Sequence, residues 1–286
     1  VIDKMINTDF LNQLDRFHLV VKKRVTSNFV GPRKSVAAGR GLTFKDHRMY
    51  APGDDIRLID WKVFARTDDL YIKTFEEERN LTAHIIMDAS ASMGFGKPIS
   101  KFDYAAMLGV GFAYLAMREN ERFQFSTFSE GLEIFQPRRG MSQLASMVFY
   151  LNNVKTQGNS KLLDAMVQYR KVVGSRSLLV LISDFLVDIS EVIEALYNLG
   201  DHEIKVIQVL DPIERDLKYS GDFKLIDSES KSMLRTYISP RLRVEYQQML
   251  DNHVAKMEDT CNNLGYHFHQ ITTNTPIFDA FYRVLE

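Results

Sequence analysis

The sequence predicts an α/β protein with a doubly wound, mostly parallel sheet that has helices on both faces, preceded by an extension of one helix and short strands. Two runs, 84–87 and 177–182, are short and densely apolar, which indicates strands buried on both faces. Elsewhere apolar residues recur every three or four positions over longer segments, which is typical of helices. Strands that alternate with helices in this way favour a parallel sheet.

Residues 1–80 are predicted to form the N-terminal extension. Apolar side chains spaced by three and four positions between Asp9 and Val25 indicate an amphipathic helix. The rest of the extension is rich in glycine, arginine and aspartate and has no helical period, so we expect turns, loops and short strands there. Within it, the alternation of Leu70–Phe75 predicts a strand.

Residues 81–286 are predicted to form the sheet domain. Ser100, followed three residues later by Asp103, has the pattern of a helix start, and Pro240 suits the first turn of a long helix. A hairpin insertion is expected near 222–237. The expected elements, in order, are a strand ending at Asp88, helix 100–118, strands 122–128 and 132–135, helices 141–152 and 160–173, a strand ending at Asp184, helix 190–199, strand 204–210, hairpin strands 223–226 and 232–236, helix 240–262, strand 266–271 and a helix after Pro276.

The amino-acid composition of the chain limits the classes of protein to which it can belong. The 286 residues, 45% of them hydrophobic, suffice for a sizeable core. The formal net charge of −1 argues against a general polyanion-binding role, so no nucleic-acid partner is expected. The single cysteine, Cys261, suits a reducing compartment. The most apolar window is about half the length of a membrane span, and the first residues lack a signal-peptide pattern, so we expect a cytoplasmic protein without direct membrane insertion.

Polar side chains gather where the first buried strand ends. The apolar run stops at Asp88, and Ser90 and Ser92 follow at alternate positions. In a parallel α/β sheet, ligands bind outside the carboxyl ends of the strands. These oxygens suit a small divalent cation, because Mg²⁺ takes one or two carboxylates together with neutral oxygen ligands and water. The alternative is that these residues only cap a following helix, since Asp and Ser are preferred at such turns.

A second strand end favours the metal site over the helix cap. The run 177–184 also ends in an acid, Asp184, and Ser160 offers one more hydroxyl at a predicted helix start. Two acids and three hydroxyls together predict a divalent-cation site, with Mg²⁺ as the first choice and Mn²⁺ or Ca²⁺ as alternatives.

This arrangement resembles the von Willebrand factor A fold and its metal-ion-dependent adhesion site, whose pattern is Asp-x-Ser-x-Ser, then a threonine loop, then an aspartate at a strand end. The residues that match those places are Asp88, Ser90, Ser92, Ser160 and Asp184. Ser160 stands where the pattern has threonine and keeps the hydroxyl. The resemblance implies that these five residues hold the cation.

A narrower resemblance covers nearly the whole chain. The run Tyr50-x-Pro-Gly-Asp-Asp-x-Arg-x-Ile-Asp-Trp61, with Ala65-Arg66 and the later Asp211-Pro-x-Glu214 and Asp227-Ser-Glu229, is similar to the bacterial family called domain of unknown function 58. The charges around the single tryptophan predict an ion-pair network that holds this segment on the sheet domain, or else a recognition surface near the metal; we favour the structural role. The residues concerned are Asp54, Asp55, Arg57, Asp60, Trp61 and Arg66.

The function follows from what the predicted site offers. It has no general base paired with a nucleophile, so we predict no catalytic residue and no enzyme. A cation held by few acids keeps an open coordination place, which an Asp or Glu carboxylate of a protein partner can fill. The sequence therefore predicts a metal-dependent protein-interaction module.

Resemblance to the family adds a partner and leaves two alternatives open. It implies a MoxR-type AAA+ ATPase as the partner, and hence a role as an adaptor or a chaperone-complex component. One alternative is a Mg²⁺- or Mn²⁺-dependent phosphohydrolase. The other is an RNA-binding module, which the near-neutral net charge of the chain disfavours.

Overall fold

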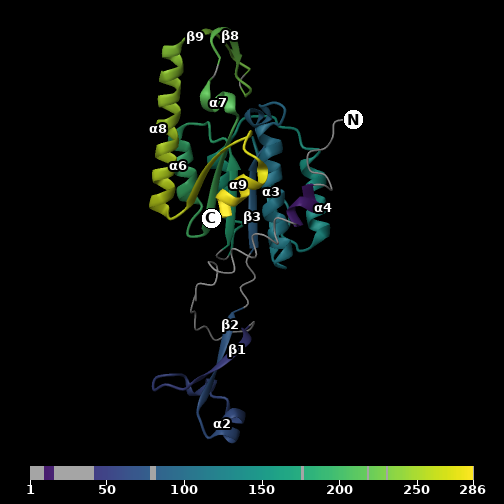
Figure 1. Cartoon of the computed structure of the whole chain (residues 1–286), viewed down its shortest axis with the longest axis vertical. Coiled ribbons are helices and arrows are strands. Elements are labelled where there is room, and N and C mark those ends of the chain that lie inside the picture. Colours follow the sequence, from purple (N-terminus) through teal and green to yellow (C-terminus); the bar gives the residue numbers. More distant parts are fainter. Residues whose placement is uncertain are drawn as a thin grey trace. The chain divides into compact units, whose positions relative to one another are not determined.

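The structure is a computed structural model, which divides into two compact units (Figure 1). The smaller unit is Val21–Asn80, and the larger unit joins Val1–Val20 to Leu81–Glu286. The residues that the structure describes are 10–15, 42–77, 82–174, 177–217, 219–229 and 231–285.

The described part of the smaller unit is a strand pair with a short helical connection. β1 (Leu42–Met49) and β2 (Tyr71–Glu77) pair antiparallel, so the strand predicted at Leu70–Phe75 is confirmed. Between them lie a 3-10 turn, η1 (Ile56–Leu58), and the helix α2 (Trp61–Thr67).

The helix α2 corrects the expectation that this region holds only loops and short strands. The carboxylate of Asp60 caps its first turn by accepting the N–H groups of Lys62 and Val63. Asp68 ends it in the left-handed conformation, with φ at 59°. A helix of seven residues is too short to show a clear apolar period, so its cap decides its formation more than its pattern does.

In the described part of the larger unit, six strands form one sheet (Figure 1). Adjacent strands run parallel, except that β5 pairs antiparallel with β4. Numbered along the chain, the order is the doubly wound 3-2-1-4-5-6, which confirms the predicted fold class and puts the topological switch point between β3 and β6. Across the sheet the strands are β10 (His267–Thr272), β7 (Glu203–Leu210), β6 (Leu178–Ser183), β3 (Thr82–Asp88), β4 (Arg122–Phe128) and β5 (Leu132–Ile134).

Helices cover both faces of this sheet (Figure 1). Neighbouring residues of β3 show the two layers, because successive side chains of a strand point to opposite faces. Ile86 belongs to the core under α5, α6 and α8, whereas Ile85 and Met87 lie against Gly109 of α3. One group of helices is α5 (Leu162–Tyr169), α6 (Ile189–Asn198) and α8 (Pro240–Leu264), and the other is α3 (Lys101–Arg118), α4 (Met141–Leu151) and α9 (Ile277–Leu285).

Two short elements and a hairpin complete the described part of the larger unit. The 3-10 turn η2 (Ala91–Gly94) follows β3, and the helix α7 (Pro212–Asp216) follows β7. An antiparallel hairpin, β8 (Gly221–Ile226) with β9 (Met233–Ile238), comes between α7 and α8, where the sequence predicts one.

The described residues near the N-terminus belong to the larger unit and pack against its helix α9. Residues 10–15 are helical, as predicted, and the rest of the helix expected from Asp9 to Val25 lies outside the described residues. Phe10 and Leu14 are buried, and the ring of Phe10 lies 6.1 Å from that of Phe278 in α9. No helix among the residues that the structure describes combines the length and apolarity of a membrane span.

Gly111 lets α3 approach α9 closely, which gives a test of the packing. A Cβ at this position would lie 1.8 Å from Cζ of the fully buried Phe281. Although alanine favours helices, Gly111→Ala should lower the free energy of unfolding by about 1–3 kcal/mol, the usual cost of overpacking. Urea unfolding measures this difference.

The matched control is Gly131→Ala. A Cβ at Gly131 meets no atom within 4 Å, so this change should move the free energy of unfolding by less than about 0.5 kcal/mol. Equal stability of Gly111→Ala and the wild type would contradict the close contact between the two helices.

Candidate metal site

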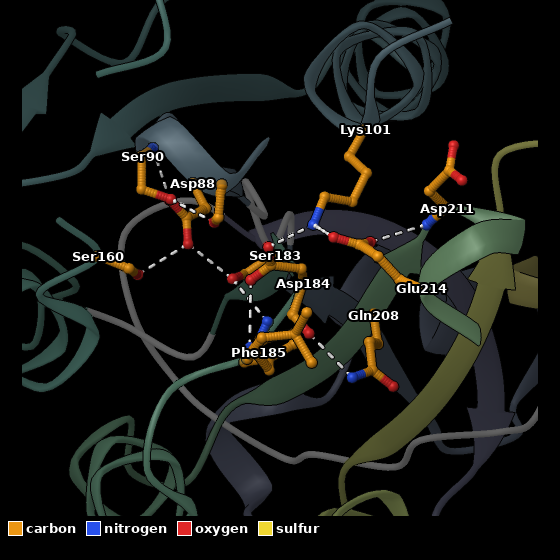
Figure 2. A network of polar contacts seen from close by, with 12 residues as sticks. Asp88, Ser90, Lys101, Ser160, Ser183, Asp184, Phe185, Gln208, Asp211 and Glu214 are labelled. Carbon is orange, nitrogen blue, oxygen red and sulfur yellow. Dashed lines mark hydrogen bonds and ion pairs between the residues drawn. The ribbon is translucent and has the colours of Figure 1, made fainter. Parts of the chain in front are cut away.

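The candidate site lies at the carboxyl end of β3, beside the switch point of the sheet (Figure 2). Asp88 is fully buried there. Its Oδ1 accepts the N–H of Ser90 at 2.8 Å, and its Oδ2 accepts the hydroxyls of Ser160 at 2.8 Å and Ser183 at 2.7 Å. One carboxylate therefore joins three segments of the chain.

Further bonds fix the loops around Asp88. The hydroxyls of Ser90 and Ser92 lie 3.1 Å apart. The N–H of Ala91 donates to the carbonyl of Gly158 at 2.9 Å, which ties the paired-serine loop to the loop that carries Ser160. Of the five predicted ligands, Asp88, Ser90, Ser92 and Ser160 thus form one hydrogen-bonded group.

Asp184, the fifth predicted ligand, follows β6 directly and lies next to this group (Figure 2). Its Oδ2 accepts Nζ of Lys101 at 2.7 Å, and its Oδ1 accepts the N–H of Leu186 at 3.2 Å. The same ammonium donates to Oε1 of Glu214 at 2.6 Å. Burial alone would lower the pKa of the fully buried Lys101, but the two carboxylates outweigh it and raise that pKa. The ammonium of Lys101 therefore holds the Asp184 carboxylate in place.

Three residues of this network were not predicted as site residues. Ser183 stands directly before Asp184 and adds a hydroxyl at the same strand end. Glu214 belongs to a capping box of α7, in which its Oε2 accepts the N–H of Asp211 at 3.1 Å. Lys101 is the first residue of α3, where a positive charge opposes the helix dipole. That mismatch was the available signal that Lys101 needs acidic partners.

The residues present fit a hard divalent cation by their chemistry. Carboxylate and hydroxyl oxygens are the ligands that Mg²⁺ and Mn²⁺ accept. Asp88 forms no ion pair within the described residues, and burial together with the neighbouring Asp184 raises the pKa of Asp88 to about 6. The environment of Asp88 is thus short of positive charge, which a cation would supply.

The candidate site contains few acidic side chains. In the described ranges no three His, Cys, Asp or Glu side chains cluster as a metal site, so a cation here would depend on serine hydroxyls and water. Both carboxylate oxygens of Asp184 already accept hydrogen bonds. Asp184 would therefore reach a cation through water, or by giving up one of these bonds.

The charged residues around Trp61 form local pairs in the smaller unit. Most of these pairs are partly exposed, and exposed pairs stabilise a fold only slightly. Trp61 itself is 62% exposed, and Arg66 is exposed on α2. These pairs include Arg48 with Asp54 (2.7 Å), Arg57 with Asp55 (2.7 Å), and Asp60 with both His47 (2.9 Å) and Lys73 (3.4 Å).

The larger unit is thus a doubly wound α/β domain with a buried polar site at its switch point. The chain belongs to the family described as protein of unknown function DUF58, which matches residues 46–256. Two relatives, the uncharacterized proteins Rv1480 of Mycobacterium tuberculosis and Mb1516 of Mycobacterium bovis, are each 27% identical to it over 257 residues. The match covers 88% of this chain and 81% of each relative.

Similar solved structures include BatB from Bacteroides thetaiotaomicron, at a TM-score of 0.46 and 10% identity, which covers 72% of this chain and 97% of that one. The vWF domain of the type V pili tip protein Mfa5 from Porphyromonas gingivalis has a TM-score of 0.38 and 12% identity, with 72% and 94% covered. A vWF domain is thus among the similar structures, and the fold class itself rests on the sheet described above.

The Lys101 ion pairs give a test of how the site is held together. Lys101→Met would leave the carboxylates of Asp184 and Glu214 without their shared cation. Because breaking a buried ion pair strands an uncompensated charge, the free energy of unfolding should fall by about 3–5 kcal/mol, as measured by urea unfolding.

An exposed lysine of the neighbouring loop serves as the control for this change. Lys97→Met should alter the free energy of unfolding by less than about 0.5 kcal/mol, because Lys97 is exposed. If Lys101→Met unfolds at the same urea concentration as the wild type, the ammonium is not what holds the two carboxylates.

Proposed function

We propose that this protein is a metal-dependent protein-interaction module. The cation would be Mg²⁺, with Mn²⁺ or Ca²⁺ as alternatives. The observation that carries the proposal is the convergence of serine hydroxyls on the Asp88 carboxylate at the switch point, which is fully buried and forms no ion pair within the described residues. The residues that would hold the cation are Asp88, Ser90, Ser92, Ser160 and Asp184.

The protein's own residues would position the ligand oxygens. Asp88 orients the hydroxyls of Ser160 and Ser183 by accepting from both, and Lys101 holds Asp184 in place. When bound, the cation would supply an open coordination position for the carboxylate of an Asp or Glu on a partner protein. Recognition of that acidic side chain is the proposed activity.

The partner that we propose is a MoxR-type AAA+ ATPase. Such a partner would make this protein an adaptor or a component of a chaperone complex. The support is the resemblance of this chain to its family.

Substitution of Asp88 tests the proposal. Asp88→Asn keeps the shape of the side chain and removes its charge. It should weaken Mn²⁺ binding, measured by isothermal titration calorimetry, by about 100-fold, because the cation loses the negative charge of a carboxylate ligand. In pull-downs from the native cells, the MoxR-type ATPase should be retained by the wild type in Mg²⁺ and lost both in chelator and with Asp88→Asn.

A charge-matched control shows whether an effect comes from the site or from the loss of any acidic side chain. Asp222→Asn removes one exposed carboxylate from β8 and should leave Mn²⁺ binding and partner capture at the wild-type level. Both Asn variants should show the circular dichroism spectrum of the wild type. Capture that persists in chelator and with Asp88→Asn would refute the metal-dependent mechanism.

A further inference from the structure

The tip of the β8–β9 hairpin brings an acid of this chain to the candidate metal site. The N–H of Ser160 donates to Oε1 of Glu229 at 3.4 Å, across 69 residues of sequence. Ser92 lies near Glu229 as well, and its hydroxyl lowers the pKa of that carboxyl. Ser160 and Ser92 come from two different loops of the site, so Glu229 meets it where those loops adjoin.

Local bonds of the turn present Glu229 in this direction. The N–H of Glu229 donates to Oδ1 of Asp227 at 3.0 Å, and the N–H of Asp227 donates to the carbonyl of Ser232 at 2.9 Å, which closes the turn. The strand residues next to the turn are not held by burial, since Ile226 and its cross-strand partner Met233 are both exposed. A two-stranded hairpin with exposed apolar residues is marginally stable by itself, so moving its tip costs little.

The charges around Glu229 are unfavourable to a carboxylate. Burial raises the pKa of Glu229, the nearby Asp184 raises it further, and the hydrogen bond from Ser160 opposes them. Glu229 forms no ion pair within the part of the chain that the structure describes, whereas Asp184 and Glu214 both pair with Lys101. The hydrogen bond from the N–H of Ser160, with Ser92 close by, therefore holds the carboxylate at the site in spite of the nearby Asp184 and Asp227.

From this geometry we infer that the N–H of Ser160 and the hydroxyl of Ser92 form the carboxylate-binding position of the site, and that Glu229 occupies it in cis. A partner's acidic side chain takes the same position by displacing the hairpin tip. The inference rests on the proposed function. It adds to that function the donors that recognise the partner's acidic side chain, and it identifies Glu229 as the internal group that competes for them. A cation beside these donors strengthens their hold on a carboxylate from either source.

The test uses the full chain loaded with Mn²⁺ and a small probe, N-acetylglutamate α-amide, which carries one glutamate side-chain carboxylate. Glu229→Gln removes the competing charge and keeps the shape of the side chain. Calorimetry should show that this variant binds the probe about tenfold more tightly than the wild type, because no internal carboxylate has to leave. Asp222→Asn, which removes a charge from the same hairpin, should bind it as the wild type does.

The outcomes separate this inference from the proposed function. If the wild type binds Mn²⁺ and Glu229→Gln binds the probe no more tightly than the wild type, the in-cis competitor is wrong and the metal site stands. If the wild type binds no Mn²⁺, the metal site and this inference both fail. Equal binding of the uncharged N-acetylglutamine α-amide to Glu229→Gln would also overturn it, because the position would not be selecting a carboxylate. Melting curves should place Glu229→Gln and Asp222→Asn with the wild type.

Discussion

The buried Asp88 carboxylate is the constraint on which the site depends. It ends β3 at the switch point, and donors from three separate segments satisfy its two oxygens. Moving a carboxylate from water into the protein interior costs roughly several kcal/mol, and hydrogen bonds offset only part of that cost. Burial, together with the charge of the neighbouring Asp184, raises the pKa of Asp88. Under the proposed function, a bound cation would complement this carboxylate.

Charge is balanced unevenly among the acids near Asp88. Lys101 supplies a buried ammonium to Asp184 and Glu214. Glu229 has no such partner among the described residues and accepts a neutral N–H from Ser160. This difference is the reason to look for the partner's carboxylate where Glu229 now lies.

The elements and residues that the sequence predicted share one property: their signal is local. Asp88 and Asp184 end apolar runs, and alternation of strands with helices predicted the doubly wound sheet. Lys101 escaped prediction because its partner Asp184 is 83 residues away, and only the tertiary fold joins them. The helix α2 was not predicted, because its formation depends on the cap at Asp60 and a helix of seven residues shows no clear apolar period. Glu229 reads in sequence as one acid in a turn, and its contact with Ser160 is again long-range.

A crystal soaked in Mn²⁺, with data collected at the manganese absorption edge, tests whether the oxygens around Asp88 share one divalent cation. We expect a single anomalous peak about 2.2 Å from an oxygen of Asp88 and from the serine hydroxyls, with Asp184 as a direct or water-mediated ligand. An anomalous map without a peak between Asp88 and Asp184, with their oxygens bonded only to the protein and to solvent, would contradict it.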